Sequence, residues 1–351
     1  MVSPLKVAVI GTGMGRYHMK EFVESPNVNL VAVCDLNRAE ALQFAKEYGA
    51  DKVVSDYHDL WEVPNLDAIS IAVPNFLHAP IAIEALERGL HVMCEKPMAT
   101  SLADAKKMVA TAEEQNKRLM IGMSQRFRPQ SLALHGMVER GELGDIYYAR
   151  STWIRRRGVP VIHFSSGGSM GRGSWFVNKE KAGAGALFDI GVHMFDLTWW
   201  LMGNPKPVSV SAASYRNLWV DEFARREIPY DIDELSSAMV RFENGVTAFF
   251  DVSWAANQDN EMNVRIFGTE AGLQVYPPAV YREPQWGELH TDTIEIKEVE
   301  AGLTPRRHFV DCIRDPEKPM IASGQECLNV MAVLDAVQRS AECGHEVEVD
   351  L

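Results

Sequence analysis

The sequence predicts an α/β protein with a doubly wound parallel sheet first and an α+β domain with a large, mostly antiparallel open sheet second. Three observations carry this prediction. Short apolar runs alternate with helical segments up to residue 123, a glycine-rich turn follows the first run, and strand patterns dominate from residue 146. A chain of 351 residues is also long enough for two domains.

The composition is that of a globular protein, with 46% hydrophobic and 24% charged residues. The net charge of −13 argues against nucleic-acid or anionic membrane partners, because binding phosphate groups needs a basic surface. The five cysteines are scattered without a Cys-x-x-Cys spacing, so reduced thiols and no metal site are expected. No stretch approaches the roughly 20 apolar residues that cross a bilayer, and no cleavable signal is recognised. A cytoplasmic location is therefore expected.

The elements of the first domain alternate between strand and helix. Runs rich in valine and isoleucine, apolar on both faces, predict buried parallel strands at Leu5–Ile10, Val28–Cys34, Ala68–Val73, His91–Cys94 and Arg118–Ile121. The segments between them predict helices at Arg38–Tyr48, Ala79–Arg88 and Leu102–Gln115. Gly49 and Gly89 are expected to cap two of these helices at their C-termini. The pattern predicts a dinucleotide-binding domain over residues 1–123.

The pattern changes near Met123–Gln125, after which a helix is expected at Gln130–Arg140. Strands are predicted at Ile146–Ile154, Val208–Tyr215, Ser236–Phe242, Val246–Trp254 and Met262–Gly268. The Asn244-Gly245 pair indicates a hairpin. Two helices, Pro305–Arg314 and Gln325–Cys343, close the chain. Residues 124–351 are therefore predicted to form an α+β domain, which the resemblance described below assigns to substrate binding and oligomerisation.

The glycine turn is the candidate cofactor site. It consists of Gly11, Thr12, Gly13, Met14 and Gly15, directly after the first strand and before the first helix. Glycine lets the backbone turn sharply and approach a pyrophosphate, which then lies on helix N–H groups. The turn departs from the usual G-x-G-x-x-G spacing, because Gly15 comes one residue early. A purely structural glycine turn is the alternative.

Asp35, at the end of the second strand, is the candidate ribose ligand. A carboxylate there accepts hydrogen bonds from the ribose diol and repels a 2′-phosphate, which favours NAD over NADP. Arg38 lies close enough to pair with such a phosphate, so NADP stays open. Asp35 is also a candidate helix N-cap, a role compatible with ribose binding. Further candidate cofactor-binding residues follow later strands: Pro74, Asn75, His78 and Glu95.

Lys96 is the candidate base. It lies in Glu95-Lys96-Pro97, directly after the strand His91–Cys94 and so at the carboxyl edge of the sheet. Burial against the sheet and a neighbouring positive nicotinamide ring would both favour the neutral amine, which can accept a proton. The alternative is a surface lysine paired with Glu95.

Asp189 and His193 are four residues apart in a predicted helix, Phe188–Leu201. They would share one face with Asp196 and Trp200, whereas the rest of the helix is apolar. Ionisable groups on a buried stripe are costly unless they are paired or functional. The alternative for His193 is a core histidine bonded to one of the two aspartates.

These features resemble the glucose–fructose oxidoreductase / inositol dehydrogenase (Gfo/Idh/MocA) family of NAD(P)-dependent enzymes. The resemblance covers nearly the whole chain. It rests on the glycine turn with His18, on Glu95-Lys96-Pro97, and on Gly-x-x-x-Asp-x-x-x-His beginning at Gly185. Ala184 interrupts what is often a run of three glycines. Family members join a Rossmann domain to a domain with an open sheet, and this sheet commonly forms a dimer or tetramer interface.

The resemblance implies roles for the three candidate catalytic residues. Lys96 and His193 would act on the proton of a substrate hydroxyl, and Asp189 would hold a neighbouring hydroxyl. The implied reaction moves a hydride between NAD and a secondary hydroxyl of a sugar, glycoside or cyclic polyol. The segment from Gln125 to Leu201 is most similar to the glycoside 3-dehydrogenase branch, which acts on C3 of a glucosyl ring.

Several residues outside this trio are candidates for the sugar pocket. They are polar or aromatic and lie in the same region of the chain: Arg126, Arg155, His163 and Trp175. Trp175 is a candidate to stack on a pyranose face.

Two other hypotheses share the cofactor. One is an NAD-dependent glycosidase that oxidises C3, eliminates the aglycone and re-reduces, with His163 or Tyr281 as an additional acid or base. The other is a non-catalytic sensor of NAD(P) or sugar.

Overall fold

The structure is a computed structural model that describes residues 3–159, 171–294 and 303–351. The chain divides into two compact units. The first contains Met1–Ser124 and Gly302–Leu328, and the second contains Gln125–Ala301 and Asn329–Leu351. The sequence prediction assigned residues 302–328 to the second domain. They group with the first unit because this segment pairs with the edge of its sheet, where the backbone N–H of Ile121 donates to the carbonyl of Ala322 at 3.0 Å.

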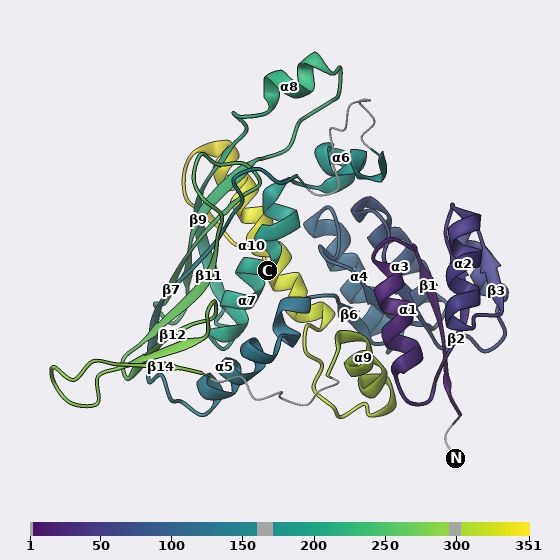
Figure 1. Ribbon diagram of the computed structural model, residues 1–351, viewed down its shortest axis with the longest axis horizontal. Helices are drawn as coiled ribbons and strands as arrows, with labels where there is room; N and C mark the ends of the chain where they lie inside the picture. Colours follow the sequence, from purple (N-terminus) through teal and green to yellow (C-terminus); the bar gives the residue numbers. More distant parts are fainter. Residues whose placement is uncertain (1–2, 160–170, 295–302) are drawn as a thin grey trace. The chain divides into compact units, whose positions relative to one another are not determined.

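The first unit is built on a six-stranded parallel sheet in the order β3-β2-β1-β4-β5-β6 (Figure 1). Its strands are β1 (Leu5–Ile10), β2 (Val28–Cys34), β3 (Lys52–Val54), β4 (Ala68–Ile71), β5 (His91–Cys94) and β6 (Leu119–Ile121). Its helices are α1 (Gly15–Glu24), α2 (Arg38–Tyr48), α3 (His78–Glu87), α4 (Leu102–Glu114) and α9 (Pro305–Arg314). α1 packs with α2, and α3 packs with α4. The strand order reverses between β1 and β4, which is where doubly wound sheets bind their ligands.

The second unit is built on a nine-stranded sheet in the order β14-β13-β12-β11-β7-β10-β9-β8-β15. Its strands are β7 (Ile146–Ile154), β8 (Pro207–Tyr215), β9 (Leu235–Phe242), β10 (Thr247–Ser253), β11 (Glu261–Gly268), β12 (Ala271–Gln274), β13 (Ala279–Arg282), β14 (His290–Thr293) and β15 (Val347–Glu348). Its helices are α5 (Pro129–Glu139), α6 (Lys179–Ala182), α7 (Val192–Leu201), α8 (Val220–Arg225) and most of α10 (Gly324–Cys343). β7 and β10 run parallel, and the other recorded pairs in this sheet are antiparallel.

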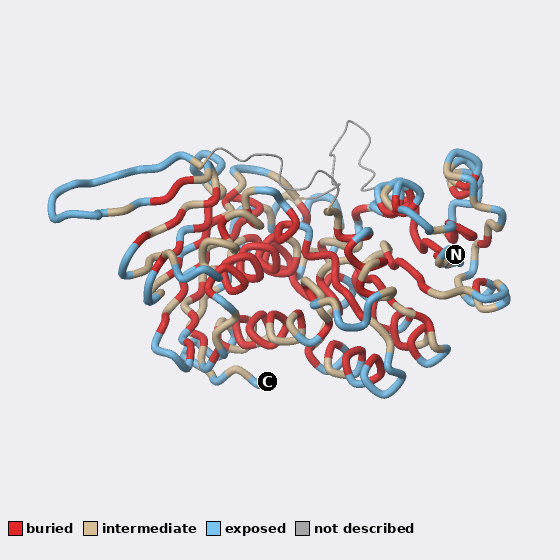
Figure 2. The backbone as a smooth tube through the Cα atoms, turned by 90° about the horizontal axis from the view of Figure 1, so that it is seen from below, coloured by how far each residue is buried: buried red, intermediate tan, exposed pale blue. Residues whose placement is uncertain are grey.

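The core of the second unit lies between one face of its sheet and α7. Side chains along β9 alternate, so that Ser236, Ala238, Val240 and Phe242 are buried while their neighbours are partly or fully exposed. α7 packs against β7, β10 and β11, and all ten of its residues are buried. Figure 2 shows the same concentration of buried residues, in contrast to the exposed hairpin that joins β13 to β14. No helix within the described ranges is long and apolar enough to cross a membrane.

The predicted helix Phe188–Leu201 is not a single α-helix. Leu187–Gly191 forms a π-helical turn, and α7 begins at Val192. Asp233 explains where this turn begins, because its carboxylate accepts the N–H groups of Gly185 at 2.6 Å and Leu187 at 2.8 Å. A Cβ on Gly185 would lie 2.0 Å from the carbonyl oxygen of Asp233, so only glycine allows this approach. Asp189 therefore lies in a wider turn than an α-helix would give it.

Asp196 pairs with Arg126 inside the second unit. The guanidinium and the carboxylate are both fully buried, with Nη2 of Arg126 2.7 Å from Oδ1 of Asp196. The guanidinium also lies over the ring of Trp200, 5.6 Å from its centroid. This arrangement differs from the predicted place of Arg126 in the sugar pocket, because the side chain is occupied by a buried ion pair.

We expect Asp196→Ala to lower the free energy of unfolding by about 3–5 kcal/mol, because Arg126 then keeps a buried charge without its carboxylate. Urea unfolding of the variant measures the loss. The double variant Arg126→Met/Asp196→Ala should recover much of it, since neither charge remains buried. Equal stability of wild type and Asp196→Ala would contradict a stabilising role for this pair.

Candidate functional site

The glycine turn is shaped for close approach of a ligand. Gly11 has φ +93°, and a Cβ there would lie 2.2 Å from the carbonyl oxygen of Ala72 on the neighbouring strand. A Cβ on Gly13 would meet nothing within 4 Å, so open space lies beside the turn. Gly15 begins α1, whose first N–H groups carry the partial positive charge that attracts phosphate. These residues fit the pyrophosphate of a dinucleotide.

Asp35 is tied to this turn from the end of β2. One carboxylate oxygen accepts from both the backbone N–H and the hydroxyl of Thr12, each at 2.7 Å. The other accepts the N–H of Asn37 at 2.7 Å. Thr12 is fully buried, so the carboxylate is held in place without a ligand. The N-cap of α2 is Asn37 rather than Asp35, because the Asn37 side chain accepts from the N–H of Glu40.

The remaining predicted cofactor residues have different surroundings. Arg38 is exposed and donates to the carbonyl of Val53 at 3.4 Å. Pro74 precedes a short 3-10 helix, Asn75–Leu77, in which Asn75 is buried. The ring nitrogens of the buried His78 lie 2.7 Å from the carbonyl oxygen of Pro97 and 2.9 Å from that of Val73. His78 therefore joins the loop after β4 to the loop that carries Lys96.

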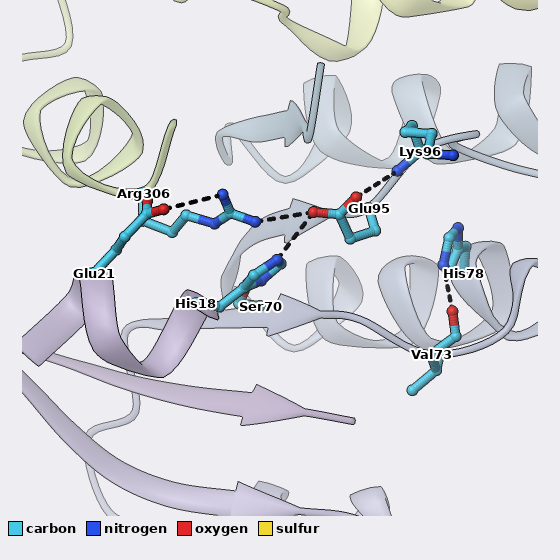
Figure 3. Close-up of polar contacts among 8 residues, drawn as sticks. All are labelled: His18, Glu21, Ser70, Val73, His78, Glu95, Lys96 and Arg306. Carbon is cyan, nitrogen blue, oxygen red and sulfur yellow. Dashed lines mark hydrogen bonds and ion pairs between the residues drawn. The ribbon is translucent and has the colours of Figure 1, made fainter. Parts of the chain in front are cut away.

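Lys96 lies directly after β5, in a loop held on both sides. Oε2 of Glu95 accepts the backbone N–H of Lys96 at 3.4 Å, and His78 binds the carbonyl of Pro97. Figure 3 shows the amine of Lys96 directed away from the Glu95 carboxylate. The Lys96–Pro97 peptide is cis. Glu95, the partner of Lys96 in the alternative prediction of a surface ion pair, is acted on by the charge of Lys96, and its Oε1 also binds other groups.

Oε1 of Glu95 is 2.9 Å from Nε2 of His18 and 2.9 Å from Nη2 of Arg306 (Figure 3). The other ring nitrogen of His18 is 2.8 Å from the hydroxyl of Ser70. Burial by itself would raise the pKa of Glu95, but the hydrogen bond and charge of His18, with the charges of Arg306 and Lys96, lower it to about 2. Burial, followed by the charge of Arg306, lowers the pKa of His18. Glu95 is therefore a carboxylate beside a neutral imidazole at neutral pH.

Asp189 in the second unit is held by residues that follow a parallel strand pair. β7 and β10 are in register with Ile154 opposite Ser253, so Arg155 and Trp254 leave the sheet at the same edge. The indole N–H of Trp254 donates to Oδ2 of Asp189 at 3.0 Å, and Nη1 of Arg155 lies 3.6 Å from the same oxygen. The Asp189 side chain is 11% exposed. The carboxylate is thus oriented by its neighbours.

Two other predicted pocket residues of this unit, His193 and Trp175, lie beside aromatic side chains. The ring centroid of His193 is 6.3 Å from that of Trp153. Trp153 lies on β7, two residues before Arg155 in the sequence. Trp175 stacks on Phe176, which meets Trp254 edge-on at 6.5 Å. His163 lies outside the described residues. Within the described ranges no group of three or more histidine, cysteine or acidic side chains is arranged to hold a metal ion.

Sequence reasoning missed three residues that shape these sites. Trp254 was predicted only as the end of a strand, Arg306 as part of a closing helix, and Asp233 not at all. Their contacts join segments at least 46 residues apart in the sequence, so local patterns give no signal for them.

The largely buried carboxylate of Glu95 predicts a loss of stability in acid. Its pKa falls from 4.5 to about 2 on folding, so the stabilisation is complete above pH 4.5 and is lost as the pH falls toward 2. This shift corresponds to at most about 3 kcal/mol. His18 acts in the same direction, because its lowered pKa favours proton uptake by the unfolded chain below pH 6.5.

We therefore expect Glu95→Gln to lose less stability than wild type between pH 7 and pH 3. Guanidinium unfolding curves at both pH values measure the difference. The prediction fails if the two proteins show the same pH dependence.

Comparison with known proteins places both units in one family. Residues 5–123 match the oxidoreductase family with an NAD-binding Rossmann fold, and residues 131–274 match the GFO/IDH/MocA C-terminal domain. The D-glucoside 3-dehydrogenase of Escherichia coli (strain K12) is 32% identical over 360 residues, covering 99% of this chain and 98% of its own.

More distant relatives extend over the same length. The scyllo-inositol 2-dehydrogenase (NAD(+)) of Bacillus subtilis (strain 168) is 24% identical over 361 residues, covering 100% of this chain and 98% of its own. The solved structure of a levoglucosan dehydrogenase in complex with NADH shares the fold, with a TM-score of 0.84, 24% identity, and coverage of 99% of this chain and 100% of that one. The chain therefore belongs to the GFO/IDH/MocA family of NAD-binding oxidoreductases.

Proposed function

We propose that this protein is an NAD-dependent dehydrogenase that acts on a secondary hydroxyl of a sugar, glycoside or cyclic polyol, with C3 of a glucosyl ring as the preferred position. The observation that carries the proposal is the Asp189 carboxylate, oriented by Trp254 and Arg155 near the start of the buried helix that bears His193. An oriented carboxylate is suited to accept hydrogen bonds from sugar hydroxyls. The glucosyl preference is supported by the name of the Escherichia coli relative.

In this proposal the first unit binds the cofactor and the second binds the substrate. Gly11, Gly13 and the start of α1 hold the pyrophosphate, and Asp35 accepts the ribose hydroxyls. NAD, when bound, supplies the acceptor for a hydride. Lys96 accepts the proton of the reacting hydroxyl, His193 orients that hydroxyl or shares its proton, and Asp189 binds a neighbouring one.

NADH formation tests the reaction with glucosides, glucose, anhydro-sugars and inositols in the presence of NAD or NADP. We expect turnover with NAD, and we expect Lys96→Ala to lower kcat by about 10²- to 10⁴-fold, because the proton acceptor is lost. Lys20→Ala is the matched control, since Lys20 is a surface lysine that is 61% exposed.

Full activity of Lys96→Ala would contradict its proposed role. Release of an aglycone without net NADH would instead favour the oxidation–elimination–reduction cycle of a glycosidase. Binding of NAD and sugar without either reaction would favour a sensor.

We also propose that the protein is a homodimer or homotetramer that assembles through the outer face of the nine-stranded sheet. Aromatic side chains gather on this face, where the ring of Tyr148 lies 5.9 Å from Phe249 and 5.1 Å from Phe267. Phe249 is 37% exposed, and Met239 lies opposite it on β9. Apolar groups clustered on an exposed face are typical of a protein interface.

Phe249→Glu should reduce the oligomer to a smaller species, because each interface would bury an unpaired charge. Light scattering after size exclusion measures the mass, and exposed Leu289 in the β13–β14 hairpin offers a control as Leu289→Glu. A wild type that is already monomeric would refute the proposal.

A cytoplasmic location is a further proposal, supported by the cysteines. All five are free thiols, and four of them are buried. Unpaired thiols are typical of proteins from reducing compartments.

A further inference from the structure

Arg306 is placed against the loop of Lys96 by a helix that comes late in the sequence. It lies in the first turn of α9, 210 residues after Lys96, and its side chain is 7% exposed. Nη2 lies 2.9 Å from Oε1 of Glu95, and Nη1 lies 3.6 Å from Oε1 of Glu21 on α1 (Figure 3). One guanidinium therefore faces two carboxylates inside the first unit.

This position is unfavourable for an arginine on helical grounds alone. The first turn of a helix carries partial positive charge, so a cation there is repelled unless anions compensate. Burial adds a desolvation cost that only charged or polar partners can offset. The local sequence of α9 gives no reason for Arg306, and the two carboxylates do.

Gly122, directly after β6, leaves the space that the Glu95 carboxylate occupies. A Cβ on Gly122 would lie 2.8 Å from Oε1 and 3.0 Å from the carboxyl carbon of Glu95. A side chain at this position would push the carboxylate away from Arg306 and His18. Gly122 and Arg306 thus restrict Glu95 independently of each other.

We propose that Arg306 is a positioning residue for the dehydrogenase reaction, acting on Lys96 through Glu95. It compensates the charge of Glu95 within the first unit and holds the carboxylate that accepts the backbone N–H of Lys96. The amine of Lys96 then stays directed away from the Glu95 carboxylate (Figure 3). This inference rests on the proposed role of Lys96 as the proton acceptor.

The charges around Glu95 indicate what removal of Arg306 would do. His18 on α1, Arg306 on α9 and Lys96 itself act on this carboxylate, whereas Glu21 on α1 contacts Arg306 and His78 binds the carbonyl of Pro97 in the Lys96 loop. Without Arg306, the negative charge of Glu95 loses its guanidinium partner, and because the imidazole of His18 is neutral, the charge of Lys96 balances more of it. The protonated amine of Lys96 gains stability, so the enzyme needs a higher pH to work.

The test compares Arg306→Met, Arg306→Lys and the double variant Arg306→Met/Glu95→Gln. The first readout is the pH profile of kcat/KM for sugar oxidation with NAD. The second is the labelling of Lys96 by acetic anhydride as a function of pH, quantified by peptide mass spectrometry. Labelling requires no turnover, so it tests Arg306 even if no sugar is oxidised. Arg314→Met is the matched control, because Arg314 lies on the same helix and contacts a backbone carbonyl, that of Asn27.

We expect Arg306→Met to move both the acid limb of the profile and the labelling midpoint to higher pH by about one unit. The KM for NAD should stay within about twofold of wild type, because the glycine turn is untouched. Arg306→Lys should show a smaller shift, and the double variant should return the midpoint toward that of wild type. Arg314→Met should leave both readouts unchanged.

An unchanged labelling midpoint in Arg306→Met would overturn the inference, as would a fall in Tm with unchanged kinetics. If Arg306→Met does not fold, Arg306→Lys decides in the same way, and a labelling midpoint equal to that of wild type overturns the inference. A wild type that labels normally but oxidises no sugar refutes the proposed function instead.

Discussion

The largely buried charge of the Glu95 carboxylate is the constraint on which the position of the Lys96 loop depends. A charge placed there needs partners, and the structure supplies the imidazole of His18 and the guanidinium of Arg306. Neither comes from the neighbourhood of Glu95 in the sequence. This requirement gives a physical reason why residues 302–328, which follow most of the second unit in the sequence, belong to the first unit. The backbone on either side of Lys96 is fixed as a result.

Buried and partly buried carboxylates have a similar role in the second unit. Asp233 accepts the first N–H groups of the turn that carries Asp189. Asp196, on the helix α7 that follows this turn, neutralises Arg126. Glu234 accepts three successive N–H groups, from Asn217 to Trp219, each within 2.8 Å. Some of the acidic side chains of this chain therefore lie in the interior, where Asp233 and Glu234 organise backbone segments and Asp196 pairs with a guanidinium. The net charge says less about partners than it would if all these groups were solvated.

Each of the two units presents chemical groups of a different kind. The first offers a backbone turn open to a pyrophosphate and an amine on a fixed loop, and the second offers a carboxylate oriented by an indole and a guanidinium. In each unit the group that would touch a ligand comes directly after a strand or begins a helix. Groups in such positions are held by the regular hydrogen bonding behind them, which lowers the cost of orienting them for a reaction.

The sequence by itself determined the elements whose cause is local. Apolar runs predicted β1, β2, β5 and β7 at their observed bounds. A strand buried on both faces is apolar throughout, and a strand buried on one face is apolar at alternate residues, so both can be recognised from the sequence. The glycine turn, Asp35, Lys96, Asp189 and His193 were also predicted as site residues, since their residue types and spacing are local, and their roles stay predictions. Only the tertiary structure decided the π-helical turn at Asp189, the burial of Arg126 and the partners Trp254 and Arg306. Each depends on a hydrogen bond, ion pair or close approach between distant segments, and no periodic pattern in the sequence encodes such a contact.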